Sequence, residues 1–252
     1  MLDRMFPTLR EFSRAFAESS PGGRVVEEDG VLAAIAPAIP DRSVLNCVVY
    51  EDVAALEASL DRVAAAYDEA GVRAWTVWVH ESDERAARAL EAAGSVFDGE
   101  PMAMGLDLGE LDDTPGDGGV EVVEGPDPAE VGRVLAASYG WPEMAGAIDR
   151  VDGELRVYIA RAGGSGAACV ATYDHGDDCG VFMVGTVPDA RGRGLCPALM
   201  RHALARGRER GRTVSTLQAT AMGRPVYARL GYRDMGRVTM WERRRPAAPS
   251  AA

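Results

Sequence analysis

Lysine is absent from the chain, so all 27 basic residues are arginine. This one-sided choice reflects a coding bias more than a function. Histidine and cysteine are also scarce, at three and four residues among 252. None of them forms a CxxC pair or a spacing typical of metal ligands, so the pattern predicts free buried thiols and no metal site. Scattered free cysteines are typical of a cytoplasmic protein.

Long hydrophobic runs are missing as well. The alanine-rich segment 53–70 is interrupted by Glu, Asp and Arg, and no other stretch approaches the length needed to cross a bilayer. The first residues, MLDRMFPTLREFSRAF, are amphipathic and include acids, which is unlike a secretory signal. We therefore expect a cytoplasmic protein with no membrane partner.

The net charge of −12 is divided unevenly along the chain. Residues 1–118 hold 9 Arg against 24 acidic residues (−15), and residues 119–252 hold 18 Arg against 15 (+3). An acidic chain argues against general nucleic-acid binding. The acidic first half would favour a cationic partner, although acidic surfaces also serve solubility alone.

The length allows one large or two small domains, and the 47% apolar fraction is sufficient for a core. The segment 112–119 is rich in Gly and Asp and has no apolar periodicity, so it predicts a linker between domains at 1–111 and 120–245. The end, 246–252, contains only Pro, Ala and Ser and is expected to be a disordered tail.

The second half shows alternating strand and helix patterns. Helices are expected from Pro128, at about 197–210 and from Pro225 to Gly231, and strands at 121–124, 155–160, 168–173, 181–187, 214–220 and 237–242. This order predicts a mixed α/β architecture, with a central sheet flanked by helices.

The first half repeats part of this order, with a helix at 53–70, a strand at 74–80 and a helix at 83–93. The glycines that end the two helices, Gly71 and Gly94, precede Gly211 and Gly231 by 140 and 137 residues. The near-constant offset predicts a degenerate internal duplication. The alternative is that helix–Gly–strand units recur by chance in α/β proteins.

The strongest local pattern is a strand, a loop and a helix over residues 181–200. The loop, Arg191-Gly192-Arg193-Gly194, allows close approach of a ligand to the backbone, and the first amides of the helix lack internal partners. Seven Arg and one acid occupy residues 191–212. These features predict a site for a phosphate-bearing ligand.

The loop has neither the GK[ST] ending of a P-loop nor a GxGxxG pattern. Arg191-Gly192-Arg193-Gly194-Leu195-Cys196 resembles instead the R/Q-x-x-G-x-G/A motif of the GCN5-related N-acetyltransferase (GNAT) superfamily. The preceding Val187-Pro188 and the later segment 227–232, Tyr-Ala-Arg-Leu-Gly-Tyr, follow that superfamily's usual order, and the resemblance covers about residues 120–243.

The resemblance implies acetyl-CoA as co-substrate and direct attack of an amine on its thioester. Tyr227 would be the general acid that protonates the departing thiolate. Backbone amides near Val187 would polarise the acyl carbonyl. The residues implied to bind the cofactor are Thr186, Val187, Arg191, Gly192, Arg193, Gly194, Leu195 and Cys196.

The sequence departs from the family pattern at Cys196, where Gly or Ala is usual, and at Pro197, which removes one amide. We interpret Cys196 as a small residue under the cofactor, with a nucleophilic thiol as the less favoured alternative. No general base is assigned. The candidates for a general base are Glu143, Asp174, His175, Asp177 and Asp178. The alternative is a water chain that removes the proton from the amine.

The first half lacks these features. At an offset of 140 the loop falls on Glu51–Leu56, which has no glycine, and at 137 Tyr227 falls on Leu90. The chain thus resembles a tandem GNAT protein with a truncated, silent first half.

We expect an N-acetyltransferase acting on an amine of a small molecule or peptide, in a monomer or a homo-oligomer. A CoA-binding sensor without turnover, and a plain α/β domain whose loop only caps a helix, are the alternatives.

Overall fold

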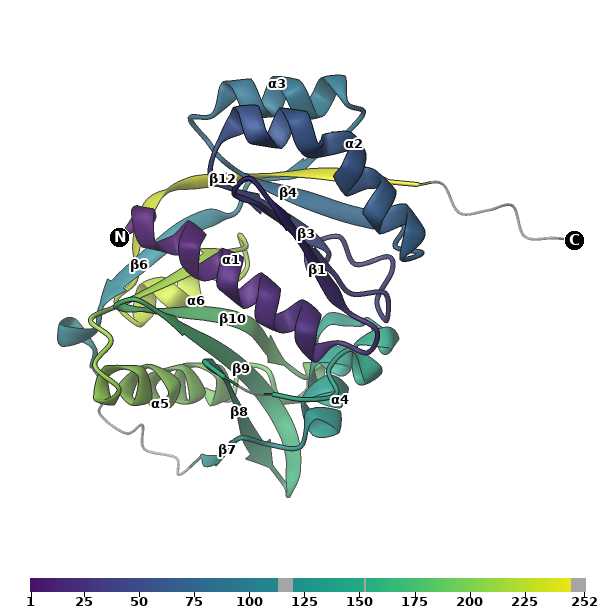
Figure 1. The fold of residues 1–252 in the computed structure, drawn as a ribbon. Helices are drawn as coiled ribbons and strands as arrows, with labels where there is room; N and C mark the ends of the chain where they lie inside the picture. The colour runs from purple at the N-terminus through teal and green to yellow at the C-terminus, as the bar shows by residue number, and fades with distance from the viewer. Residues whose placement is uncertain (113–119, 152, 246–252) are drawn as a thin grey trace, which may run out of the picture.

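The computed structural model describes residues 1–112, 120–151 and 153–245 (Figure 1). The first half contains α1 (Leu2–Ser19), β1 (Arg24–Glu28), β2 (Val31–Ile35), β3 (Cys47–Tyr50), α2 (Val53–Glu69), β4 (Ala74–His80), α3 (Glu84–Ala92), β5 (Val96–Gly99), β6 (Met102–Asp107) and the 3-10 helix η1 (Leu108–Glu110). The predicted linker, apart from residue 112, and the predicted tail lie outside the described residues.

The second half alternates in the same manner. It contains β7 (Glu121–Glu124), α4 (Pro128–Tyr139), η2 (Pro142–Gly146), β8 (Leu155–Ala162), β9 (Ser165–His175), β10 (Asp178–Thr186), η3 (Pro188–Ala190), α5 (Leu195–Glu209), β11 (Val214–Ala219), α6 (Arg224–Arg229) and β12 (Arg233–Arg244).

Local sequence signals set most of these boundaries. The Asp127 carboxylate accepts the amide of Ala129, Pro128 opens α4, and Gly140 ends it in the left-handed conformation. The predicted strand at 74–80 is confirmed, and the predicted helix at 53–70 is confirmed to within one residue. The predicted start of the next helix at Pro197 is wrong by two residues, because α5 already begins at Leu195.

The described strands form one mixed sheet, in the order β1-β2-β3-β4-β12-β6-β11-β10-β9-β8-β7, with β5 also paired to β12. The predicted mixed α/β fold class is thereby confirmed. The two halves exchange their last strands. β6 of the first half pairs antiparallel with β11, and the end of β12 pairs antiparallel with β4. The start of β12 pairs with β6, so the sheet is continuous across both halves.

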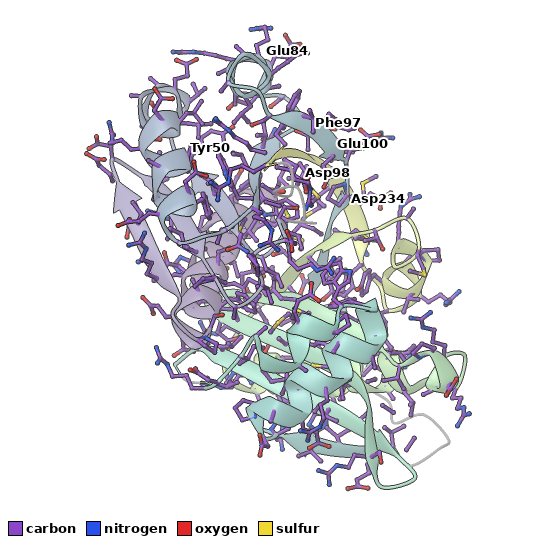
Figure 2. The ribbon with its side chains drawn as sticks, turned by 90° about the vertical axis from the view of Figure 1, so that its right-hand side faces the viewer. Tyr50, Glu84, Phe97, Asp98, Glu100 and Asp234 are labelled. Atoms are coloured by element: carbon purple, nitrogen blue, oxygen red, sulfur yellow. The ribbon has the colours of Figure 1, made fainter. Side chains whose placement is uncertain are left out.

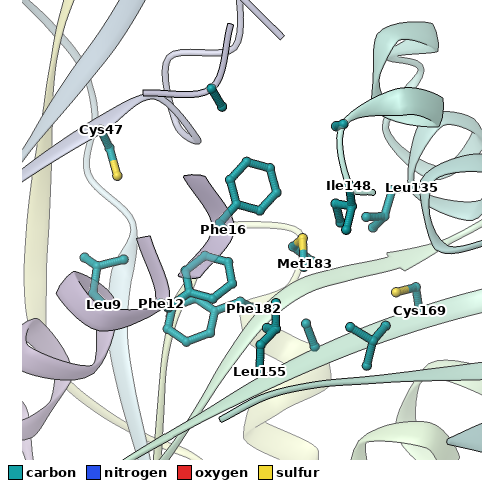
Figure 3. Close-up of a cluster of buried hydrophobic side chains, with 14 of the residues drawn as sticks. Leu9, Phe12, Phe16, Cys47, Leu135, Ile148, Leu155, Cys169, Phe182 and Met183 are labelled. Carbon is teal, nitrogen blue, oxygen red and sulfur yellow. The ribbon is translucent and has the colours of Figure 1, made fainter. Parts of the chain in front are cut away.

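Helix α1 packs between the two halves (Figure 1). Its buried side chains include Leu9, Phe12 and Phe16, which belong to a core shared with α4, η2 and the strands of both halves. The Phe12 ring stacks on Phe182 of β10 with 3.8 Å between centroids (Figure 3). This contact fixes α1 against the face of the sheet opposite α5.

Two hydroxyl groups of α1 also reach the first residues of two strands. Thr8 Oγ1 donates to Asp178 Oδ2 of β10 at 2.8 Å, and Ser13 Oγ lies 3.2 Å from Cys47 Sγ of β3. Helix α1 is therefore anchored to corresponding places in both halves.

Candidate acyl-CoA site

The last part of β10 is irregular. Its pairing with β9 shifts between Phe182 and Gly185, so β10 carries one extra residue there. Met183 has φ of 49°, in the left-handed region that residues other than glycine rarely adopt. This β-bulge bends the strand and leaves backbone polar groups without ladder partners. Strained backbone of this kind is often retained at functional sites.

Strands β10 and β11 separate towards the same end. Within the described residues their parallel pairing is limited to Asp178 and Val214. The amide of Val187 donates to the carbonyl of Ala167 at 2.9 Å, on the β9 side. Because successive amides of a strand point to opposite edges, the amide of Thr186 points towards β11, beyond the end of their ladder. The amide of Thr186 therefore has the orientation required to polarise an acyl carbonyl, and the assignment of this role to backbone amides near Val187 stays a prediction.

The Arg/Gly loop lies next to this opening, at the start of α5. Gly192 and Gly194 have φ of 74° and 75°, and no side chain caps the helix. Neither glycine Cβ would meet an atom within 4 Å, so the loop faces open space. In the described part of the chain, the amides of residues 192–196 donate to no acceptor. A cluster of unpaired amides at a helix start favours an anion.

The two loop arginines differ in their contacts. Arg191 Nε donates to the carbonyl of Thr186 at 3.2 Å, and its Nη2 donates to the carbonyl of Ser138 at 3.0 Å. Arg191 thus braces the loop against β10 and α4, and its predicted contact with a phosphate stays a prediction. Arg193 is exposed beside the free amides.

The last turn of α4 packs against the bulge. Tyr139 donates its hydroxyl to the carbonyl of Val184 at 3.1 Å. A Cβ on Gly185 would lie 2.7 Å from Ser138 Cβ, so only glycine fits there. Ser138 Oγ is buried and has no partner among the described residues. Sequence reasoning missed both α4 residues, because the periodicity that predicts a helix does not show which strand its end contacts.

Tyr227 lies on α6, half-buried, with its ring centroid 6.0 Å from that of Tyr232. Burial, and secondly the nearby Cys196 thiol, raise the pKa of Tyr227 above its ordinary value. The phenol is therefore protonated at neutral pH and able to donate. Burial also raises the pKa of Cys196 to about 11, so its thiol is neutral and poorly suited to nucleophilic attack.

Most of the acidic residues considered as bases lie at the other end of β10. Asp174 pairs with Arg210 at 2.6 Å, Asp177 pairs with Arg4 at 2.6 Å, and Asp178 is the first residue of the strand. Eight residues of extended strand span roughly 25 Å, so this end of β10 is far from Thr186. Glu143 is the exception: it follows α4 and pairs with Arg42.

A shallow groove borders α6. It has a volume of about 330 Å³ and is lined by Met104, Arg224, Pro225, Ala228, Tyr232 and Asp234. Asp234 lies on the side of the molecule that also bears Phe97, Asp98 and Glu100 (Figure 2). None of the predicted cofactor-binding residues lines this groove, so it is separate from the Arg/Gly loop.

The described residues contain no group of three or more His, Cys, Asp and Glu side chains arranged to hold a metal ion. Of the helices described, none has the length and hydropathy required to cross a bilayer.

Comparison with known proteins agrees with this geometry. Residues 179–235, which contain all of β10 except its first residue, the loop, α5 and Tyr227, match the family described as acetyltransferase (GNAT) domain. No curated protein matches the chain.

Solved structures extend the similarity to nearly the whole chain. A GCN5-related N-acetyltransferase from Kribbella flavida superposes with a TM-score of 0.66 at 17% identity, over 94% of this chain and 95% of its own. An acetyltransferase of the GNAT family from Novosphingobium aromaticivorans gives 0.58 at 18% identity, over 93% and 99%. A tandem GNAT protein from the clavulanic acid biosynthesis pathway gives 0.55 at 15% identity, over 98% and 97%. Residues 179–235 therefore match a GNAT acetyltransferase domain, and the chain as a whole has the fold of the GCN5-related N-acetyltransferases.

Proposed function

We propose that the protein is an N-acyltransferase that moves the acetyl group of acetyl-CoA to an amine. The observation that carries this proposal is the cluster of free amides at residues 192–196, beside the opening between β10 and β11. An anionic pyrophosphate matches the amides, and an extended arm matches the unpaired edge of β10.

The residues at this end of the sheet divide the work of binding. The amides of Gly192, Arg193, Gly194, Leu195 and Cys196 would hold the pyrophosphate, with Arg193 adding charge. Thr186 and Val187 would lie along the pantetheine arm. Acetyl-CoA supplies an acetyl group activated as a thioester. The Thr186 amide would stabilise negative charge on the acyl oxygen.

Tyr227 would complete the transfer. As the amine nitrogen bonds to the acyl carbon and the carbon–sulfur bond breaks, the Tyr227 phenol would give its proton to the thiolate. A water chain would remove the proton from the amine, and solvent would reprotonate Tyr227. The presence of a tyrosine at position 227 together with the Arg/Gly loop favours an enzyme over a CoA sensor without turnover.

We further propose that the first half is a degenerate copy of the second. The support is that β3 and β4 are parallel, as β10 and β11 are, and that β4 and β11 each pair with the last strand of the other half. The acidic first half would favour a cationic acceptor, either a small molecule or a peptide. The cytoplasmic location and a monomeric or homo-oligomeric state stay predictions.

Calorimetric titration with acetyl-CoA tests the proposal. Gly194→Glu puts a negative charge at the amide cluster, which should weaken binding at least about 100-fold, since like-charge contacts cost several kcal/mol. Two controls match it. Gly194→Ala changes the left-handed backbone without charge, and Gly211→Glu adds the same charge after the other end of α5, also at positive φ in open space.

Binding that survives Gly194→Glu, or that Gly211→Glu weakens equally, would contradict this site. Thiol release from acetyl-CoA in the presence of a panel of polyamines, amino acids and aminoglycosides then separates an enzyme from a sensor.

A further inference from the structure

A loop of the first half reaches the end of α4 in the second. The loop runs from β2 to β3 and carries Arg42, whose guanidinium carbon lies 4.6 Å from the centre of the Trp141 ring. Arg42 Nε also donates to Glu143 Oε1. The Arg42 and Glu143 side chains are only 27% and 29% exposed, so water screens this contact less than a surface ion pair.

The first half holds the Arg42 backbone firmly. The fully buried Asn46 side chain accepts the amide of Ala36 at 2.7 Å and donates to the carbonyls of Ile39 and Arg42 at 3.0 and 3.3 Å. The neighbouring Asp41 is paired with Arg73 of the first half. Because the loop has little freedom, the first half determines where the Arg42 guanidinium lies.

From Trp141 the contacts continue to the β10 bulge. The Trp141 and Tyr139 rings lie 5.0 Å apart at 41°. The Tyr139 hydroxyl donates to the carbonyl of Val184, which belongs to the bulge. This hydrogen bond keeps the Val184 carbonyl directed at α4.

We propose that Arg42 is a positioning residue for acyl transfer, through which the first half fixes the β10 bulge by way of Trp141 and Tyr139. The inference rests on the proposed function. Arg42 touches no reacting atom, and its contribution is geometric. A displacement of about 1 Å at the reacting centre can lower a rate about 100-fold.

The test uses acetyl-CoA carrying carbon-13 at the acetyl carbonyl, because it requires no acceptor. On binding to the wild type, the carbonyl resonance should move from its position in free acetyl-CoA, because the Thr186 amide next to the bulge would polarise the carbonyl. Arg42→Gln and Tyr139→Phe should each lose part of this displacement. The dissociation constant for acetyl-CoA should stay within about twofold, because the phosphate site lies elsewhere.

Arg4→Gln is the matched control. Arg4 Nε bonds to Asp177 Oδ1 at 2.6 Å and also joins the two halves, but at the far end of β10. It should leave the resonance unchanged. With the panel amine that gives the fastest thiol release, Arg42→Gln should lower kcat about tenfold to 100-fold with little change in the KM for acetyl-CoA. Arg42→Lys should recover part of kcat, because an ammonium also binds the Trp141 face.

Each outcome has a definite meaning. A resonance and a kcat that stay at wild-type values in Arg42→Gln overturn the inference, as does an equal change in Arg4→Gln. If Arg42→Gln does not fold, Glu143→Gln and Tyr139→Phe provide the same comparison with the wild type. If the wild type gives no bound resonance, the proposed function itself fails, which the calorimetric titration would show independently.

Discussion

Two helices at corresponding places in the two halves begin in opposite ways. Helix α2 follows β3 and is closed by Asp52, whose carboxylate accepts the amides of Ala54 and Ala55 at 2.9 and 3.0 Å. Helix α5 follows β10 and begins after Gly194, with no side-chain cap. A carboxylate of the protein therefore lies in the first half where an anionic ligand is proposed in the second. One topology gives a self-capped helix or an open anion site, according to the residue before the first turn.

The strands before these helices differ as well. β3 has four residues in regular register with β2, whereas β10 has nine and carries the bulge. Tyr227 on α6 is half-buried, but Leu90, at the offset of 137, is fully buried in α3. On the proposed duplication, the first half would keep the frame of the site and lack the groups that would do chemistry.

The largest expected effect is on turnover. Tyr227→Phe should lower kcat by about 10²–10⁴ if the phenol is the general acid, while calorimetry should show an unchanged dissociation constant for acetyl-CoA. Tyr50→Phe is the control in the first half: Tyr50 bonds to Asp83 Oδ2 at 2.7 Å near the start of α3 (Figure 2). If Tyr227→Phe keeps the wild-type turnover, Tyr227 is not the general acid, and the two halves would no longer differ in this catalytic side chain.

The next effect concerns stability and pH. Burial raises the pKa of Asp178 to about 6 from 3.8, against the hydrogen bonds from Thr216 and Thr8, which lower it. The folded state therefore binds this proton more tightly, and the associated stability is complete below pH 3.8 and lost as the pH rises through 6. The difference corresponds to ~3 kcal/mol at about 1.4 kcal/mol per pH unit.

Asp178→Asn should remove this dependence. Urea unfolding of wild type and variant between about pH 4 and pH 8 measures it, because the difference between the two curves isolates this carboxyl from the others. If the unfolding free energies of wild type and Asp178→Asn change with pH in parallel, the pKa of Asp178 is the same in the folded and unfolded states, which would contradict the prediction. The corresponding first residue of β3 is Cys47, which burial keeps neutral by raising its pKa to about 11, so Cys47→Ala should leave the pH dependence unchanged.

Several features of the fold could be predicted because they depend on local chemistry. Asp127 and Pro128 start α4, Gly140 ends it, and the free amides of the Arg/Gly loop follow from two glycines and a helix start. Tyr227 was assigned by resemblance, through its short-range spacing from Gly231, and its catalytic role stays a prediction.

Other features depend on contacts between distant segments and could not be predicted. Strand β6 of the first half pairs with β11 of the second half, although β11 begins at Val214, 112 residues after the start of β6 at Met102. The alternation of apolar and polar residues along a strand does not identify the strand with which it pairs. The bulge at Met183 and the contact of Tyr139 with Val184 likewise require the packing of α4 on β10. Which of the amides near Val187 are free also depends on the register with β9, because the Val187 amide donates to the carbonyl of Ala167.

A smaller effect would sharpen the contrast between the helix starts. Asp52→Ala removes the cap of α2 and should cost about 1 kcal/mol of unfolding free energy, measured in urea, whereas Asp52→Asn retains an acceptor and should cost less. Neither change should alter the affinity for acetyl-CoA. If calorimetry shows a second acetyl-CoA site in Asp52→Ala, the Asp52 carboxylate alone was preventing binding at the start of α2. The glycines before α5 would then contribute less to acetyl-CoA binding than we infer.

The smallest expected effect is at Cys196. A thiol at a helix start is usually made more acidic by the helix dipole, but burial raises the pKa of Cys196 to about 11. Cys196→Ala should therefore change kcat by less than about twofold, a difference of a few tenths of a kcal/mol, and iodoacetamide should inactivate the wild type slowly at neutral pH. A large loss of turnover in Cys196→Ala, with acetyl-CoA affinity intact, would instead assign the thiol a covalent role. The second half would then differ from the first in having a nucleophile as well as the proposed anion site.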